Sequence, residues 1–201
     1  SSDAVVNYAS GSGGTTLTFN YTVVSGNASS DLDYASTSAL ALNSGTINDA
    51  AGNAATLTLA SPGASNSLSN SKALVIDGIV PTVSNVTSTT SNGTHKLGDA
   101  IVITIAFSET MTVTGTPQLT LETGSSDAVV NYASGSGSST LTFNYTISAG
   151  EASNDLDYAS TSALALNSGT IKDGAGNAAT LTLASPGASG SLGANKALVV
   201  D

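Results

Sequence analysis

Cysteine, arginine and tryptophan are absent from this chain of 201 residues, and only 9% of the residues are charged. Without cysteine the fold can use neither disulfides nor thiolate metal sites, and it has no thiol nucleophile. Four lysines stand against 14 Asp and Glu, so the net charge is −10. This balance repels phosphate backbones and anionic membrane surfaces, so nucleic acid is not an expected partner. Cations remain attractive, because carboxylate, amide and carbonyl oxygens are the ligands that Ca²⁺ takes.

Long apolar runs are missing as well. The longest, such as residues 100–107, have the length of a strand rather than of a membrane span. No stretch has the pattern of a signal peptide, so we expect this segment to be soluble, without membrane insertion, and any export signal to lie outside it. The chain is nonetheless 40% hydrophobic, with regularly spaced Val, Ile, Leu and Thr, which predicts a folded protein.

Features typical of a catalytic site are scarce. The single histidine, His95, is expected in a turn, and no serine has a neighbouring base motif such as GxSxG. Two aspartates side by side on one strand do not flank a sugar as the paired acids of a glycosidase must. We therefore expect that the protein is not an enzyme.

A close internal repeat dominates the sequence. Residues 1–77 and 125–201 align without a gap at an offset of 124, and 14 of the 77 aligned positions differ. Both copies contain DLDYASTSALALNSGTI, and they end in KALVID and KALVVD. Such a repeat is typical of a tandem array in which each unit is a structural module that contacts its neighbours. Neighbouring repeats of the same chain are therefore the first expected partners.

The boundary between the modules is expected in VIDGIVPTV, at residues 75–83, because Pro81 fixes φ and Gly78 loosens the chain before a new edge strand. On this phase, residues 78–201 form one complete repeat. Residues 1–77 are then the C-terminal part of the preceding repeat, without its first strands. Either this open half was cut from a longer array, or something else completes it.

Apolar and polar residues alternate with a period of two almost everywhere, as a sheet with one buried face requires. Clusters of Gly, Ser and Asn separate the runs and predict turns, such as SNGT at residues 91–94 and DGAGN at residues 173–177. The pattern predicts an all-β fold, an Ig-like β-sandwich of seven to eight antiparallel strands repeated in tandem. The expected strands are residues 82–89, 100–107, 117–122, 128–133, 140–147, 162–167, 179–184 and 197–200.

Several motifs occur in a fixed order along the chain: KLGD at 96–99, FSE at 107–109, GTPQLTLETG at 115–124, DLDYASTSALAL at 155–166 and DGAGN at 173–177. Together they resemble the Ig-like tandem repeat of giant bacterial surface and adhesin proteins. The resemblance covers residues 78–201 and, through the internal match, residues 1–77. It implies an extracellular module that holds ligand-binding domains away from the cell, with Ca²⁺ at the domain junctions. It does not imply which ligand the tip binds, because a fold does not dictate a partner.

Two pairs of aspartates are candidate calcium ligands, Asp31 with Asp33 and Asp155 with Asp157. Residues two apart on extended backbone point to one face at roughly 7 Å, while Leu156 between the second pair points into the core. This geometry suits shared coordination of one Ca²⁺ with carbonyls or another carboxylate. The alternative is that both aspartates are solvated and block pairing of a strand edge.

A second candidate site follows from the topology of a sandwich. Glu109 and Asp173 follow the second and sixth strands, at the pole where the chain enters, and Asp77 of the linker is expected there too. These carboxylates are expected to converge on one interdomain Ca²⁺. The alternative is that DGAGN is only a tight turn, in which the aspartate accepts backbone amides. Asp49 begins the corresponding turn of the first copy, which reads DAAGN.

These observations lead to one main prediction of function and two alternatives. The main prediction is a structural spacer repeat of an extracellular bacterial adhesin or cell-surface filament, rigidified by Ca²⁺. One alternative is a self-assembling fibre or surface-layer unit, in which strand exchange with other copies of the chain completes the open half. The other is a glycan- or protein-binding Ig-like module, against which the near-identity of the copies and the aromatic content of 4% argue.

Overall fold

The computed structural model describes residues 3–201. The chain divides into two compact units, and the division falls between Ile79 and Val80. All of the buried hydrophobic core of the described residues belongs to the second unit, Val80–Asp201.

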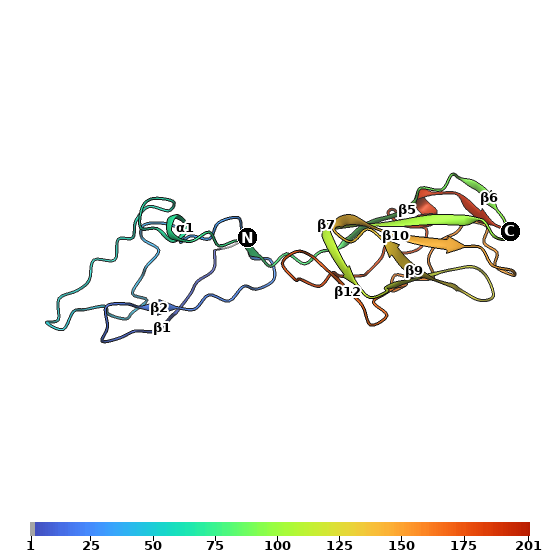
Figure 1. Ribbon diagram of the computed structural model, residues 1–201. Coiled ribbons are helices and arrows are strands. Elements are labelled where there is room, and N and C mark those ends of the chain that lie inside the picture. The colour runs from blue at the N-terminus through green and yellow to red at the C-terminus, as the bar shows by residue number, and fades with distance from the viewer. Residues whose placement is uncertain (1–2) are drawn as a thin grey trace. The chain divides into compact units, whose positions relative to one another are not determined.

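The second unit is built on one seven-stranded sheet (Figure 1). The order along this sheet is β11-β8-β9-β10-β7-β12, and β5 also pairs with β7. Every pair in it is antiparallel, which confirms the prediction of an all-β fold with antiparallel strands. Its strands are β5 (Val83–Ser88), β7 (Ala100–Thr114), β8 (Gln118–Leu121), β9 (Ala128–Ser134), β10 (Ser138–Thr146), β11 (Leu164–Ala165) and β12 (Thr170–Lys172).

Three small elements complete the second unit. β6 (Gly93–His95) pairs in parallel with β13 (Leu198–Val200), and the one-turn helix α2 (Leu192–Asn195) contacts β5. The helix is started by Ser191, whose side chain accepts a hydrogen bond of 3.2 Å from Ala194 N. The two helices of the described residues have four residues each, too few for either to cross a membrane.

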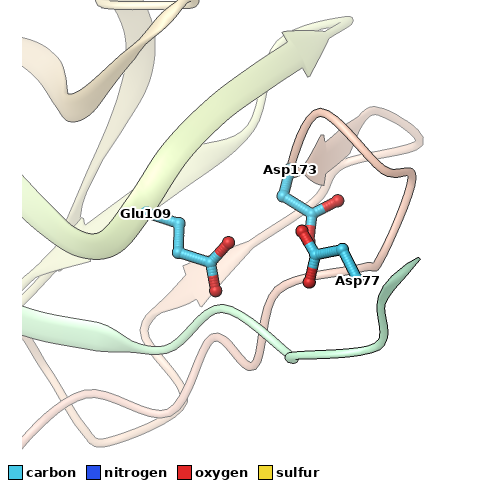
Figure 2. A group of neighbouring side chains, drawn as sticks. All are labelled: Asp77, Glu109 and Asp173. Atoms are coloured by element: carbon cyan, nitrogen blue, oxygen red, sulfur yellow. The ribbon is translucent and has the colours of Figure 1, made fainter. Parts of the chain in front are cut away.

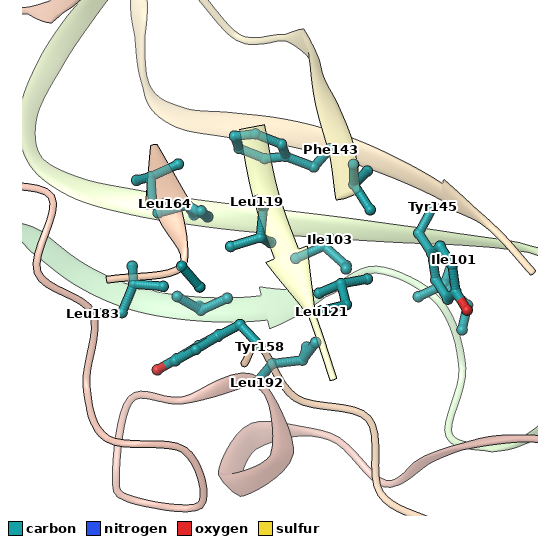
Figure 3. Packing of buried hydrophobic residues seen from close by; sticks show 14 of the residues in the cluster. Ile101, Ile103, Leu119, Leu121, Phe143, Tyr145, Tyr158, Leu164, Leu183 and Leu192 are labelled. Carbon is teal, nitrogen blue, oxygen red and sulfur yellow. The ribbon is translucent and has the colours of Figure 1, made fainter. Parts of the chain in front are cut away.

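The longest strand, β7, has 15 residues and pairs with β5, β10 and β12. Its β-branched residues alternate between faces, and the inward side chains Ile101, Ile103 and Ile105 are all 0% exposed. Figure 3 shows Ile101 and Ile103 in one cluster with Leu119 and Leu121 of β8. The period-two pattern in the sequence therefore reports the buried face of this strand directly.

Most expected strands are observed with somewhat different ends, but the strand expected at 179–184 is wrong. That segment forms only an isolated parallel bridge between Thr82 and Thr180 and a hydrogen bond of 2.9 Å from Leu183 N to Thr161 O. Leu183 is nevertheless buried, with 3% of its surface exposed. The alternation of apolar and polar residues at 179–184 therefore reports a buried side chain, although the backbone there does not pair with a neighbouring strand.

Other elements were not expected from the sequence. β6 begins inside the turn predicted at 91–94, so His95 lies in a strand rather than in a turn. β12 and the continuation of β7 beyond residue 107 were also missed, although they pair with each other. Both cases involve partners that are distant in sequence, for which a local pattern carries no signal.

The first unit, which ends at Ile79, contains only short elements. β1 pairs with β2 and β3 with β4, both antiparallel. Its caps repeat those of the second unit at the offset of 124, since Ser67 accepts a hydrogen bond from Asn70 N as Ser191 does from Ala194 N. The elements are β1 (Tyr8–Ser10), β2 (Thr18–Phe19), β3 (Ala28–Ser29), α1 (Leu68–Ser71) and β4 (Ile76–Asp77).

This first unit lacks a core. Of its described residues, only Ser67 and Gly78 are buried. Phe19 is 41% exposed, whereas its counterpart Phe143 is 0% exposed. Both rings make the same edge-to-face contact with a tyrosine, at centroid distances of 6.2 Å and 6.1 Å. The difference in burial arises because no strand among the described residues covers the first unit as β5 to β8 cover the second.

The two copies provide a matched test of this difference. We expect Phe143→Ala to lower the free energy of unfolding of the second unit by about 3–5 kcal/mol, because it leaves a cavity in a closed core. Phe19→Ala is expected to cost less than about 1 kcal/mol, because the ring is already partly in water. Urea denaturation of both variants of the full chain measures the two values. Equal losses would contradict the description of the first unit as open.

Candidate metal centre

Asp173 begins a turn that its own carboxylate organises. The turn follows β12 and is closed by a bridge between Lys172 and Ala178. Asp173 Oδ1 accepts a hydrogen bond of 2.8 Å from Asn177 N, and Asp173 Oδ2 accepts one of 2.8 Å from Asn177 Nδ2. Gly176 has a φ of 96°, which favours glycine. Asp173 is therefore buried, at 5% exposed, with a structural role of its own.

The corresponding turn of the first unit has the same design. Asp49 Oδ1 accepts hydrogen bonds of 2.9 Å from Ala51 N and 2.8 Å from Asn53 N, and Asn53 Nδ2 donates to Asp49 Oδ2 at 2.9 Å. Gly52 takes a φ of 92°. Turn chemistry is thus present in both copies, whether or not a metal binds at either. The turn needs no core around it, since Asp49 is exposed and keeps every one of these contacts.

The hydrogen bonds of this turn also determine its charge at neutral pH. Burial opposes ionisation of Asp173, but hydrogen bonds from the Asn177 side chain and from backbone amides of the turn hold the pKa of Asp173 below its usual range. For Asp49, hydrogen bonds from Asn53 are the main cause of a lowered pKa. Both aspartates are therefore carboxylates at neutral pH, which a metal ligand requires.

Glu109 of β7 lies next to this turn in the second unit. A carboxylate oxygen of Glu109 and one of Asp173 are within 4.8 Å of each other. Figure 2 shows these two side chains. Oxygen ligands lie at about 2.3–2.6 Å from Ca²⁺, so two ligands of one ion are separated by up to about 5 Å. Two negative charges at this separation repel each other, and a cation between them would remove the repulsion. The structure thus brings together two of the residues expected at this site, and their role as metal ligands stays a prediction.

Asp77, the third residue labelled in Figure 2, belongs to the other unit. It ends β4, and its carboxylate accepts a hydrogen bond of 3.1 Å from Ile79 N. Its membership of a shared site with Glu109 and Asp173 stays a prediction.

The pair Asp155 and Asp157 faces α2. Leu156 between them is 0% exposed, as expected, but Asp155 lies in a bend rather than in a strand. A Cβ built on Gly193 would lie 2.9 Å from Asp157 Oδ2 and 3.6 Å from Asp155 Oδ2, so both carboxylates lie over the same point of the helix. Their role as calcium ligands stays a prediction.

Asp157 already has protein partners. Its carboxylate accepts hydrogen bonds from Tyr158 N and Gly187 N, both at 2.9 Å. In the first unit, Asp33 accepts the corresponding bonds from Tyr34 N at 2.9 Å and Gly63 N at 3.1 Å. Each aspartate thus ties the chain after it to a turn 30 residues further on, and this role does not require a metal.

A serine that the sequence did not single out adds to this arrangement in the first unit. Ser69 Oγ donates to Asp33 Oδ2 at 2.6 Å, and Ser69 corresponds to Gly193. Desolvation opposes ionisation of Asp33, but the hydrogen bonds from Ser69, Gly63 and Tyr34 hold the pKa of Asp33 well below its usual range. Asp31 is exposed, and its backbone amide donates to Ser29 Oγ at 3.3 Å. The difference between Ser69 and Gly193 marks a place where the two copies of this site are chemically distinct.

The chain matches no family model, no curated protein and no solved structure. The resemblance to adhesin repeats therefore remains an inference from the motifs in the sequence.

Gly193→Ser tests whether Asp157 accepts the contact that Asp33 makes. We expect the free energy of unfolding to rise by about 1 kcal/mol, since serine has the higher helix propensity and adds a hydrogen bond to a carboxylate. The Asp157 carboxylate must shift by a few tenths of an ångström to admit the new Cβ. Gly193→Ala is the control, because it changes propensity without adding a hydroxyl. A serine variant no more stable than the alanine variant would contradict the expected hydrogen bond.

Asp173→Asn tests the charge of the buried turn. At pH 7 we expect a loss of roughly 1–3 kcal/mol, because hydrogen bonds to a charged acceptor are replaced. A depressed pKa in the folded state contributes stability that is present above the unfolded pKa of about 3.9 and is lost as the pH falls through the folded pKa. The parent chain should therefore lose more stability than the variant between pH 5 and pH 2 in urea titrations. Parallel curves would show that Asp173 is not the titrating group.

Proposed function

We propose that the chain is a non-enzymatic spacer from an extracellular bacterial adhesin or cell-surface filament, made of Ig-like β-sandwich repeats of 124 residues. The observation that carries this proposal is the gapless internal match, in which 14 of 77 positions differ. A module repeated with so little change serves a function that is the same in every copy, as length and stiffness are. An all-β unit with a closed core is suited to this role.

The surface of the second unit also favours a spacer over a glycan-binding module. Glycan and protein sites commonly use exposed aromatic side chains. Among the described residues of this unit, the large exposed hydrophobics are all aliphatic: Val80, Leu97, Val129 and Leu166. Its tyrosines and phenylalanines are buried or half-buried, as Phe143 and Tyr158 illustrate with 0% exposure.

Calcium at the junction would give the array its stiffness. The support is the pair of carboxylates from Glu109 and Asp173, which lie within 4.8 Å in the second unit. Asp77 is four residues before Pro81. The Cα atoms of Asp77 and Pro81 can therefore be at most ~14 Å apart, the length of a fully extended chain between them. The length of the linker therefore allows a carboxylate of the preceding repeat to reach the entry to the next one. Ca²⁺ shared between them would restrict rotation at the linker.

The second candidate function is a self-assembling unit in which strands from another chain complete the first unit. It is favoured by the exposed apolar side chains of the first unit, such as Phe19 and Leu74, which are each 41% exposed. Exposed apolar surface next to unpaired strand edges is the usual substrate for strand addition.

A lengthened chain tests the spacer. One and two further copies of residues 78–201 are joined after Asp201, where the new junction Asp–Gly repeats the sequence of Asp77 and Gly78. In a stiff array each copy adds the same increment to the maximum dimension measured by small-angle X-ray scattering. In a flexible array, dimensions grow only as roughly the square root of the number of copies. Linear growth supports the spacer, and square-root growth in excess Ca²⁺ would contradict it.

Thermal unfolding of the full chain tests the calcium site separately. Excess Ca²⁺ should raise the midpoint by roughly 5–10 °C over the value in EDTA, because ligand that binds only the folded state adds stability. Glu109→Gln should remove at least half of this rise. Glu122→Gln is the matched control, since Glu122 is exposed and outside the carboxylate pair. A parent chain that melts at the same temperature in both buffers would exclude calcium at the junction.

A further inference from the structure

The first unit presents an apolar face whose counterpart is closed in the second unit. We call this surface the open face and define it by Leu17, Phe19, Tyr21, Leu68 and Leu74. Phe19, Leu68 and Leu74 are 41%, 36% and 41% exposed, and Leu17 and Tyr21 are half-buried. The counterparts of all five residues belong to one core cluster in the second unit, and exposed apolar residues of such a set mark a surface that a partner covers.

In the second unit, a single continuous segment covers the same positions. Leu141, Phe143 and Tyr145, the counterparts of the first three residues, are paired along β10 with Ile105, Ile103 and Ile101 of β7. The counterparts of Leu68 and Leu74 are Leu192 and Leu198, which are 0% exposed. Figure 3 shows Leu192 packed in the cluster that contains Ile103, Leu119 and Leu121. All of these covering side chains come from β5 to β8, within residues 80–124.

Residues 80–124 also supply the backbone partners of the later strands. β5 to β8 pair with β9, β10, β11, β12 and β13, so every later strand of the second unit has a partner in residues 80–124. In addition, Val86 N donates to Gly190 O at 2.9 Å next to α2. The corresponding backbone of the first unit has β1 paired only with β2 and β3 only with β4 among the described residues.

The sequence of the open face matches the closed one. All five residues that define it are identical to their counterparts at the offset of 124. The differences between the copies that fall on core positions are conservative, such as Val23 against Ile147 and Ile76 against Val200. The open face therefore offers the side-chain surface that residues 80–124 cover in the second unit.

From this correspondence we propose that the open face is a docking site for one kind of partner, a polypeptide segment with the sequence of residues 80–124. Docking completes the first unit with the pairings seen in the second: a β7 strand beside residues 14–22, the counterpart of β10, a β5 strand beside that β7 strand, and a β6 strand beside residues 74–76, the counterpart of β13. The partner is recognised by main-chain hydrogen bonds along the strands and by alternate isoleucine and leucine side chains in the core. The inference rests on the two copies within this chain and does not depend on the proposed spacer role or on calcium.

A second copy of the chain does not satisfy this site by exchange. Each chain contains one segment of this sequence and two surfaces that can accept it, the open face and residues 125–201 of its own second unit. A segment moved to the open face of another copy leaves its own second unit open. Exchange between copies conserves the number of open faces and gains no buried area, so a further segment of this sequence is required.

The test supplies that segment. A copy of residues 80–124 is joined before Ser1 of the full chain, where the new sequence around the junction repeats that of Gly124 and Ser125. Leu74→Cys introduces the only thiol, since the chain has no cysteine. In the parent chain we expect this thiol to react rapidly with a maleimide. In the lengthened chain it should react roughly 100-fold more slowly, as expected for a side chain released only by unfolding of the unit.

A control lengthened chain carries Ile103→Asp and Ile105→Asp in the added copy alone, and it should react as fast as the parent. Hydrogen exchange gives a second measurement without the thiol, since peptides that include Val23 or Ile147 distinguish the two units. Equal rates for the lengthened chain and its control would overturn the proposal. Slow reaction of the thiol in the parent chain would also overturn it. A slow rate that does not depend on protein concentration would mean that the first unit closes alone. A slow rate that depends on concentration would mean that a second copy of the chain covers the open face.

One difference between the copies predicts a further effect. Asn195 Nδ2 donates to Val86 O and to Asn85 Oδ1, both at 2.7 Å, and so ties α2 to β5. The first unit has Ser71 at this position, whose side chain bonds instead to Ser67 O at 2.8 Å. Ser71→Asn in the lengthened chain should slow the thiol reaction by about another tenfold, since it restores hydrogen bonds to the added segment. The same substitution in the parent chain should change nothing, and slowing there would contradict docking on this face.

Discussion

Pairing with β7 is the interaction on which the rest of the second unit depends. This strand pairs with β5, β10 and β12, and its side chains Ile101, Ile103 and Ile105 are all fully buried. Removing it would expose the apolar face of β10 and free β5 and β12 together. The first unit shows this situation within the same chain: without strands equivalent to β5 to β8, identical residues such as Phe19 remain partly in water. Burial of the apolar face, and not local sequence, separates the two units.

The acidic residues illustrate how one group can serve both turn formation and metal binding. Asp173 and Asp157 are occupied by backbone amides and an asparagine side chain, which explains why they lie where they do without any metal. A carboxylate has about four lone-pair directions, so the two hydrogen bonds that Asp157 accepts from Tyr158 N and Gly187 N leave room for a cation. The hydrogen bonds keep Asp173 ionised, and Glu109 brings a second negative charge within 4.8 Å. The turn is therefore already ordered by its own hydrogen bonds before a metal binds, and this order would lower the entropic cost of metal binding.

The sequence allowed the all-β class, most strand positions and the meeting of Glu109 with Asp173 to be predicted, because alternation and turn residues are local signals. It did not predict β6, β12 or the loss of pairing at 179–184, because these depend on which distant strand lies alongside. His95 illustrates the limit: its neighbours read as a turn, and only the parallel partner β13 makes the segment a strand. Asp155 and Asp157 were expected on a strand, but neither lies in one, and both carboxylates lie near Gly193 of α2. The role of Ser69 was missed because nothing near it in sequence points to Asp33.

Comparison of the two copies separates what local sequence determines from what packing adds. Tyr34 and Tyr158 both donate their hydroxyl at 2.7 Å to a backbone carbonyl 26 residues later, and the aspartate turns and helix caps are repeated as well. These contacts form in the first unit although it has no buried core, so they are contained in the residues shared by both copies. What the first unit lacks is a partner for its strand edges and a cover for its apolar side chains. Because these turns, helix caps and tyrosine hydrogen bonds are already formed, closing the open face requires little rearrangement of residues 17–76. The free energy gained by burying apolar side chains is then available to drive docking of the partner segment.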